Sequence, residues 1–182
     1  IFQGPAMVVL AATASFLLLM GVSRREGRPS GLALATYIAL GIGLHNLGEG
    51  LAIGAAFAAG AAGLGTFLVM GFTLHNITEG IGIAAPILKV KPPLWAFAGL
   101  ALLAGGPAVI GMWIGSLAYA PHWSALALAI GAGAILQVII EVGLYLMRSS
   151  GRGSSAILSP PVLAGLAVGV GFMYATAMLV KI

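Results

Sequence analysis

The chain has no cysteine and very little charge. Its 182 residues include eight basic and four acidic side chains. Only 7% of the residues are charged, whereas a soluble domain carries roughly 25%. The lack of cysteine excludes disulfides and thiolate metal ligands. The lack of charge argues against a water-covered surface, and a net charge of +4 does not make a nucleic-acid-binding face. With 60% hydrophobic residues, the chain is predicted to be an integral membrane protein.

Six apolar segments are long enough to span a bilayer, which takes about 20 residues in a helix. They cover approximately residues 6–22, 31–59, 62–88, 93–118, 123–147 and 160–181. Glycine, proline and serine gather between them, and none shows the period-two alternation of a membrane β-barrel. We therefore predict one all-α, multi-pass transmembrane domain over residues 1–182. The chain begins at Ile1, so we expect a fragment or a processed chain in which something upstream is missing, and residues 1–5 resemble the remnant of a protease-cleaved tag.

The basic residues predict the orientation. If each segment crosses once, one side of the membrane receives seven of the eight cations: Arg24, Arg25, Arg28, Lys89, Lys91, Arg148 and Arg152. The other side receives Lys181 alone. By the positive-inside rule the first side is cytoplasmic. Trp95, Tyr119, His122 and Trp123 fall at segment ends, where we expect interfacial anchors, whereas Trp113 lies deeper and is predicted to pack between helices.

The 28 glycines are predicted to let membrane helices approach closely. In lipid the hydrophobic effect does not drive helices together, and small residues allow the close van der Waals packing that does. The examples are Gly41, Gly43, Gly131, Gly133, Gly165, Gly169 and Gly171.

Two of the four acidic residues lie in a repeated motif inside apolar segments. The chain reads LHNLGEG from Leu44 and LHNITEG from Leu74. In each copy a histidine precedes a glutamate by four residues, so both side chains lie on one face of a helix. The two helices should be antiparallel and carry their motifs near the middle of the bilayer. Inverted repeats with a site at the midplane are a known arrangement in transporters.

A divalent cation would explain why two glutamates lie at this depth. A charged side chain at the centre of a membrane helix costs roughly 2.5–3.5 kcal/mol, and two carboxylates cannot compensate each other. Two imidazoles and two carboxylates, from His45, Glu49, His75 and Glu79, suit Zn²⁺ and also Fe²⁺, Mn²⁺, Co²⁺ or Cd²⁺. Asn46 and Asn76 are further ligands or outer supports, and Gly50 and Gly80 are predicted to clear space beside the glutamates that they follow. The alternatives are interhelical hydrogen bonds or a proton relay through neutral glutamate.

With these residues in view, the chain resembles the ZIP (Zrt/Irt-like) divalent-metal transporters. The resemblance rests on the two HNxxEG motifs and on the segment GAGAILQVIIEV from Gly131. It implies an eight-helix fold, of which the six segments would be the third to eighth. It also implies transport of Zn²⁺ or a similar ion into the cytoplasm across the plasma or inner membrane, in a protein that is often a homodimer. The ion would be the cargo, held by His45, Glu49, His75 and Glu79 with Asn46 as a further ligand, and no resident cofactor or enzymatic activity is expected.

The chain departs from the family pattern in two respects. Gly48 and Thr78 stand where the family usually has a proline, which leaves the local backbone of the site open. Relatives with a second metal position use extra acidic residues, where this chain has Asn76 and the uncharged Gly105–Pro107 region. Because only two carboxylates lie at this depth, we predict one tightly bound ion per chain.

Two other polar residues lie within a membrane segment. Gln137 and Glu141 are four residues apart on the fifth segment. Glu141 is interpreted as a gate, a proton site or a transient metal site, or else as a partner in a bond to a neighbouring helix.

Two competing functions of the protein also stay open. One is an intramembrane metal-dependent hydrolase, although the HExxH motif is absent. The other is a structural or proton-conducting subunit.

Overall fold

The computed structural model describes residues 4–25, 27, 29–117 and 121–179. Throughout these residues the secondary structure is helical and contains no strand, which confirms the predicted all-α class. The elements are α1 (Pro5–Arg25), α2 (Gly31–Ala58), α3 (Ala62–Ala84), the 3₁₀ turn η1 (Ala85–Ile87), α4 (Leu94–Leu117), α5 (Pro121–Ser149), the 3₁₀ turn η2 (Gly153–Ala156) and α6 (Pro160–Leu179). Tyr119 and Lys181 fall outside the described residues.

Five of the helices are long and apolar enough to cross a membrane. These are α1 to α5, with α3 counted together with η1. The apolar stretch of α6 that was searched, Pro160–Thr176, is shorter than the others. The predicted multi-pass character is therefore supported by five helices, and the sixth span stays a prediction.

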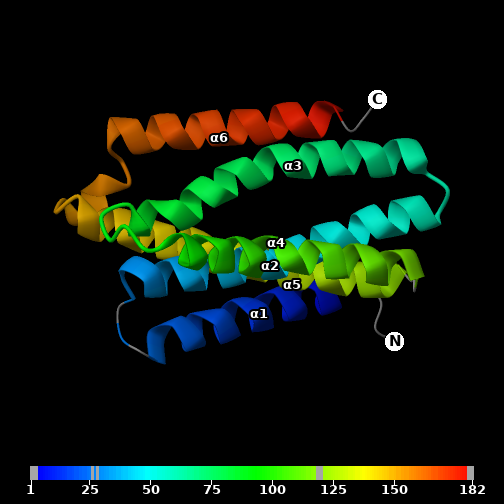
Figure 1. Cartoon of the computed structure of the whole chain (residues 1–182), viewed down its shortest axis with the longest axis horizontal. Coiled ribbons are helices and arrows are strands. Elements are labelled where there is room, and N and C mark those ends of the chain that lie inside the picture. Colours follow the sequence, from blue (N-terminus) through cyan, green and yellow to red (C-terminus); the bar gives the residue numbers. More distant parts are fainter. Residues whose placement is uncertain (1–3, 26, 28, 118–120, 180–182) are drawn as a thin grey trace.

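The helices run side by side and alternate in direction (Figure 1). α1, α3 and α5 end where α2, α4 and α6 begin, so the odd connections share one end of the bundle. Six described cations lie in the helix ends and connections at this end: Arg24, Arg25, Lys89, Lys91, Arg148 and Arg152. We call it the basic end. The two termini lie near the opposite end (Figure 1).

Helix α2 is the most deeply buried helix and packs closely against α4. A Cβ atom added to Gly43, Gly50 or Gly54 of α2 would clash with a backbone carbonyl of α4. The reverse holds for Gly111 and Gly115 of α4, whose added Cβ atoms would clash with carbonyls of α2. The two backbones are therefore in direct contact, as expected where small residues face each other in lipid. Gly41 and Gly133 likewise make close interhelical contacts, so the predicted packing role of the central glycines is confirmed.

Helices α3 and α6 lie together on one side of the bundle, above α2 and α4 in Figure 1, and pack more loosely. A Cβ atom at Gly165, Gly169 or Gly171 of α6 would meet nothing within 4 Å. The prediction that these three glycines allow close packing is therefore wrong within this chain, because α6 turns almost all of its surface outward.

Two further predictions are corrected or refined by the fold. Trp113 was expected to pack between helices, but it is 65% exposed on the outer face of α4. The third helix was expected to continue to residue 88, but its α-helical part ends at Ala84 and becomes the 3₁₀ turn η1. Pro86 lies in η1, and because proline has no N–H and its ring clashes with the preceding turn, it disfavours a continued α-helix.

Candidate metal centre

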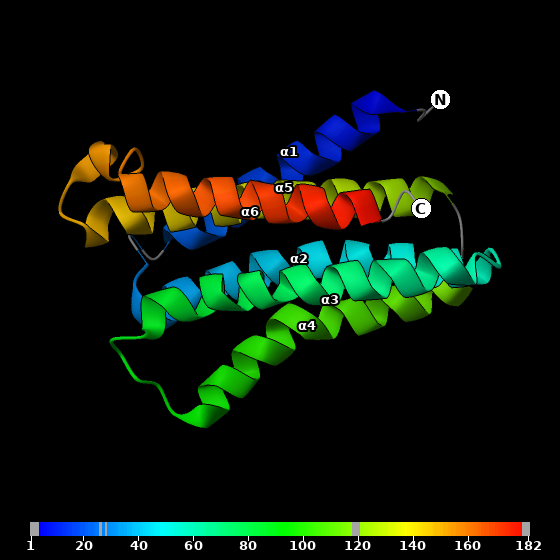
Figure 2. The ribbon, with the colours of Figure 1, turned by 90° about the horizontal axis from the view of Figure 1, so that it is seen from above.

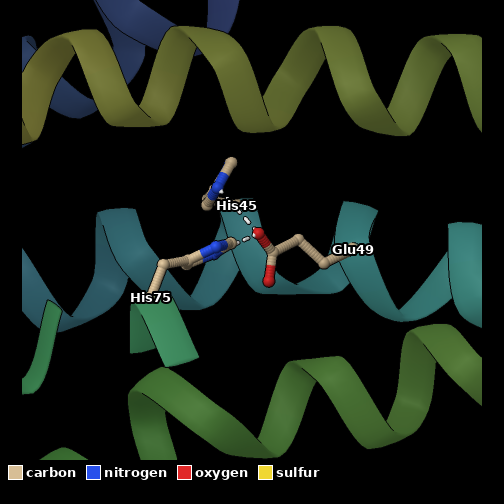
Figure 3. Close-up of side chains that lie close together, drawn as sticks. All are labelled: His45, Glu49 and His75. Atoms are coloured by element: carbon tan, nitrogen blue, oxygen red, sulfur yellow. Dashed lines mark ion pairs between the residues drawn. The ribbon is translucent and has the colours of Figure 1, made fainter. Parts of the chain in front are cut away.

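Three side chains of the repeated motifs converge between α2 and α3. His45 and Glu49 lie one turn apart on α2, and His75 reaches them from α3 (Figure 3). Glu49 Oε1 lies 3.2 Å from His45 Nε2 and 2.6 Å from His75 Nε2. One nitrogen or oxygen atom from each residue lies within 4.8 Å of the other two, an arrangement that could hold a metal ion.

The reversal of the chain after α2 explains which residues meet. Ala59 to Ala61 connect α2 to α3, and α3 runs back along α2 (Figures 1 and 2). Going away from this connection, Glu49 precedes His45 on α2, whereas His75 precedes Glu79 on α3. His45 lies 15 residues before Gly60 and His75 lies 15 residues after it, so the two histidines are brought level, and their ring centroids are 6.4 Å apart. Glu49 lies one turn nearer to the connection and contacts both imidazoles, whereas Glu79 lies one turn farther from it.

The two histidines differ in their surroundings. His75 is 6% exposed, and its ring lies edge-on to Phe72 with centroids 5.4 Å apart. The side chain of His45 is 28% exposed and faces α5 at Gly131. A Cβ atom at Gly131 would lie 3.1 Å from His45 Cα and 3.4 Å from His45 Nδ1. Gly131 therefore makes room for the imidazole of His45, a role that the sequence indicated only as general helix packing.

The contact between His75 and Glu49 meets the distance of an ion pair but not the geometry of a hydrogen bond. Nε2 of His75 is buried and has no hydrogen-bond partner in the described part of the chain, although Glu49 Oε1 is 2.6 Å away. Two such atoms gain little from each other directly, because a hydrogen bond weakens steeply when it is poorly aligned. A cation coordinated by both atoms would supply a partner for this nitrogen.

Glu79 lies outside this group of three and faces an adjoining cavity. The cavity has a volume of about 220 Å³, and its lining includes Asn46, Asn76, Glu79 and Gly80 together with Ala104 of α4. Three of its oxygen atoms are buried without a hydrogen-bond partner among the described residues: Asn46 Oδ1, Asn76 Oδ1 and Glu79 Oε2. Buried polar atoms without partners are uncommon, so these oxygens are free to bind water or a cation.

Asn46 is held in place by the neighbouring helix. Its Nδ2 donates a hydrogen bond to the carbonyl of Ala104 on α4 at 3.1 Å, and the residue is only 3% exposed. Because the amide nitrogen is engaged with α4, the amide oxygen is the atom left for the cavity. This fixed orientation is what a ligand or an outer support of a cation site requires.

The residues that precede the two motif glutamates, Gly48 and Thr78, have different local roles. A Cβ atom at Gly48 would lie 3.2 Å from the carbonyl of Ala127, so glycine allows α5 to approach α2 here. Thr78 donates a hydrogen bond to the carbonyl of His75 at 2.6 Å, inside its own helix. Both motif segments are α-helical in the structure, and the helix therefore continues through the site.

Glu141 bonds to a neighbouring helix at a distance from this site. It is 0% exposed and accepts a hydrogen bond from Ser23 Oγ of α1 at 2.8 Å, and Arg24 Nη2 lies 3.6 Å from the same oxygen. Gln137 is 1% exposed and packs against Gly41 of α2. This geometry matches the last of the alternatives for Glu141, an interhelical bond. Glu141 follows Gly131, beside His45, by 10 residues of α5, which corresponds to about 15 Å.

His122 is exposed, and its ring lies 5.3 Å from that of Trp123, as expected for an interfacial residue.

The donor set that the motifs bring together consists of two imidazole nitrogens and one carboxylate, with amide and carboxylate oxygens in the adjoining cavity. Imidazole with few carboxylates suits Zn²⁺ and similar transition metals, whereas Ca²⁺ and Mg²⁺ prefer oxygen alone.

Sequence reasoning missed the residues that hold this donor set in place. Gly131 lies close to the backbone of His45, and the backbone carbonyl of Ala104 accepts a hydrogen bond from Asn46. Contacts of this kind leave no pattern in the sequence.

Comparisons with protein-family models, with curated proteins and with solved structures give no match for this chain. The functional inference therefore rests on the motifs and on the geometry of His45, Glu49 and His75.

Proposed function

We propose that the protein transports divalent transition-metal ions across a membrane through the site between α2 and α3. The observation that carries this proposal is the convergence of His45, Glu49 and His75 inside helices long enough to span a bilayer. Three ligands from two helices bind an ion strongly enough to strip part of its water and leave coordination positions free. Zn²⁺ is the preferred cargo, with Fe²⁺, Mn²⁺, Co²⁺ and Cd²⁺ as further candidates.

The resemblance to the ZIP transporters supports the direction of transport, toward the cytoplasm. By the positive-inside rule the basic end is then the cytoplasmic end. The same resemblance supports a homodimer in the plasma or inner membrane. Glu49 and Glu79 together balance the charge of one divalent ion, so we propose one tightly bound ion per chain, with Asn46 and Asn76 as neutral oxygen donors beside it.

The decisive experiment is metal uptake by sealed proteoliposomes. The chain is reconstituted, a panel of divalent chlorides is added outside, and the metal content of the lumen is followed over time. We expect saturable uptake of Zn²⁺ that is lost in the Glu49→Ala variant. Metal binding without uptake, by vesicles in which the chain is shown to be correctly inserted, would contradict transport.

Two competing functions predict different results in the same vesicles. A metal-dependent hydrolase would bind Zn²⁺ without moving it, and would need a general base in addition to the ligands. Within the described part of the chain, Glu79 is the one carboxylate near the group of three, and the hydrolase alternative would assign it this role. A structural or proton-conducting subunit would show no metal-dependent rise in thermal stability.

Protons should compete with the metal. Ligand imidazoles must be neutral to coordinate an ion, and an ordinary imidazole titrates near pH 6.5. We therefore expect the affinity for Zn²⁺ to fall as the pH is lowered from about 8 to about 5, with the steepest change in the imidazole range. Calorimetric titrations at several pH values measure this. A constant affinity over that range would exclude coordination by His45 and His75.

A further inference from the structure

The outer face of α4 carries an apolar groove. The groove has a volume of about 690 Å³, and its lining includes Gly99, Leu102, Gly106 and Trp113. These residues recur every three to four positions or a multiple of this spacing, so they share one helical face. Leu102 is 73% exposed, whereas the opposite face of the helix, with Leu100 and Ala104, is buried. The groove therefore opens away from the bundle, at whose edge α4 lies (Figure 2).

Two glycines give the groove its depth. A Cβ atom at Gly99 would meet nothing within 4 Å, and one at Gly106 would meet only the side chain of Leu102, at 3.5 Å. Neither glycine is therefore required by packing within the chain, unlike Gly111 and Gly115 on the buried face of the same helix. The absence of side chains at these two positions leaves space that a ligand of the outer face can fill.

Tryptophans mark both ends of this face. Trp95 lies one turn before Gly99 and is 74% exposed, and Trp113 is 65% exposed. The 18 positions from residue 95 to residue 113 correspond to about 27 Å of helix, close to the roughly 30 Å of a bilayer's hydrocarbon core. Tryptophan prefers the boundary between hydrocarbon and headgroups. The groove thus runs in the direction of the acyl chains, and its half from Trp95 to Gly106, about 16 Å of helix, matches the depth of one leaflet.

Two lysines stand at the basic end of the groove. Lys89 and Lys91 are exposed in the connection that leads into α4. Backbone N–H groups of Val90 and Lys91 donate to the carbonyl of Ile87 at 3.0 and 3.2 Å. A Cβ atom at Gly31 would lie 3.3 Å from Val90 Cγ2, so the connection also rests against the start of α2. Among the described residues, no exposed carboxylate lies at this end to neutralise the lysines.

We propose that the groove and the two lysines form a binding site for one anionic phospholipid. The phosphate of the headgroup pairs with Lys89 and Lys91, and one acyl chain lies along the half of the groove that is nearer to the basic end, from Trp95 past Gly99 to Gly106. Charge complementarity selects an anionic lipid, since each lysine near an anionic membrane surface contributes favourably. A parallel second copy of the chain is a poorer occupant, because a symmetric contact across α4 would bring the same lysines of both copies together.

The test is a lipid titration of the full chain in neutral detergent, followed by native mass spectrometry. The probes are dioleoyl phosphatidylglycerol and dioleoyl phosphatidylcholine. We expect the wild-type chain to retain one phosphatidylglycerol with an affinity about 30-fold higher than that for phosphatidylcholine, since two lysines each contribute about fivefold. The Lys89→Gln/Lys91→Gln variant should bind both lipids alike. The Arg148→Gln/Arg152→Gln variant removes the same charge from the same end and should keep the preference.

A second pair of variants tests the groove itself. Gly99→Phe fills the groove without a backbone clash and should weaken the binding of both lipids about tenfold, because it displaces several methylenes of the acyl chain. Gly165→Phe on α6, where an added Cβ also meets nothing, should bind as the wild type does. Equal affinity for the two lipids in the wild type would overturn the proposal. So would an undiminished preference in the double lysine variant, or a change in oligomeric state as the only effect of Gly99→Phe.

Discussion

Replacing Glu49 by alanine should reduce the affinity for Zn²⁺ by about 100-fold or more, beyond the 10–100-fold that the loss of an outer supporting residue costs. Glu49 is the only carboxylate in the group of three, and its Oε1 contacts both His45 and His75. Without it, two neutral imidazoles would face a divalent ion in a low-dielectric interior, and only Glu79 in the adjoining cavity would be left to offset its charge. Calorimetric titration of the purified variants with Zn²⁺ measures the loss.

The control for this result is His122→Ala, which removes an exposed histidine outside the site and should leave the affinity for Zn²⁺ unchanged. Glu49→Gln preserves the shape of the side chain and tests charge alone, so it should also bind weakly. Thermal unfolding in the absence of metal shows whether each variant is folded. An affinity for Zn²⁺ in Glu49→Ala within about threefold of the wild type would show that the ion does not bind here.

The Glu79→Ala variant tests whether Glu79 contributes as much to metal binding as Glu49 does. The two motifs are equivalent in sequence and predict that Glu79 matters as much as Glu49. In the structure Glu79 faces the cavity with Asn46 and Asn76 instead of joining the group of three. If the ion is held by His45, Glu49 and His75, this variant should lose less affinity than Glu49→Ala. Equal losses would place Glu79 among the ligands.

The course of the helices could be predicted almost entirely from the sequence. Long apolar runs separated by glycine, proline and charge give the number of helices and, within a few residues, their ends. The misjudged ends have local causes. α1 continues to Arg25, because a cation in the last turn of a helix is favourable and can reach past the apolar core. α3 gives way to η1, which contains Pro86.

The contacts between helices could not be predicted in the same way. Periodicity fixes which residues share a face of one helix, but says nothing about which helix that face meets. Glu141 illustrates this limit: its partners Ser23 and Arg24 lie 118 and 117 positions away along the chain. The sequence identified Glu141 as an acid inside a membrane segment, and its bond to a neighbouring helix could be found only from the position of α1.

The glycines that follow the motif glutamates show the same limit in a testable form. Gly50 and Gly80 occupy the same place in the two copies, and the sequence suggests that both make room beside a carboxylate. In the structure Gly50 lies against α4, where an added Cβ would clash with the carbonyl of Ala108. A Cβ at Gly80 would meet nothing within 4 Å. For Gly50 the reading of free space beside the carboxylate is therefore wrong, because backbone from α4 occupies that space.

Alanine at these two positions should accordingly have opposite effects on stability. Gly50→Ala forces α2 and α4 apart where their backbones touch, and overpacking of this kind costs about 1–3 kcal/mol. The midpoint of thermal unfolding should fall by about 5 °C or more. It should also weaken metal binding, because the bond between Asn46 and Ala104 spans the same interface. Gly80→Ala replaces an unconstrained helical glycine and should leave the midpoint unchanged or raise it slightly. Unfolding of both variants in detergent, followed by circular dichroism, tests the pair. Equal stability of the two variants would mean that α2 and α4 are not in backbone contact at this point.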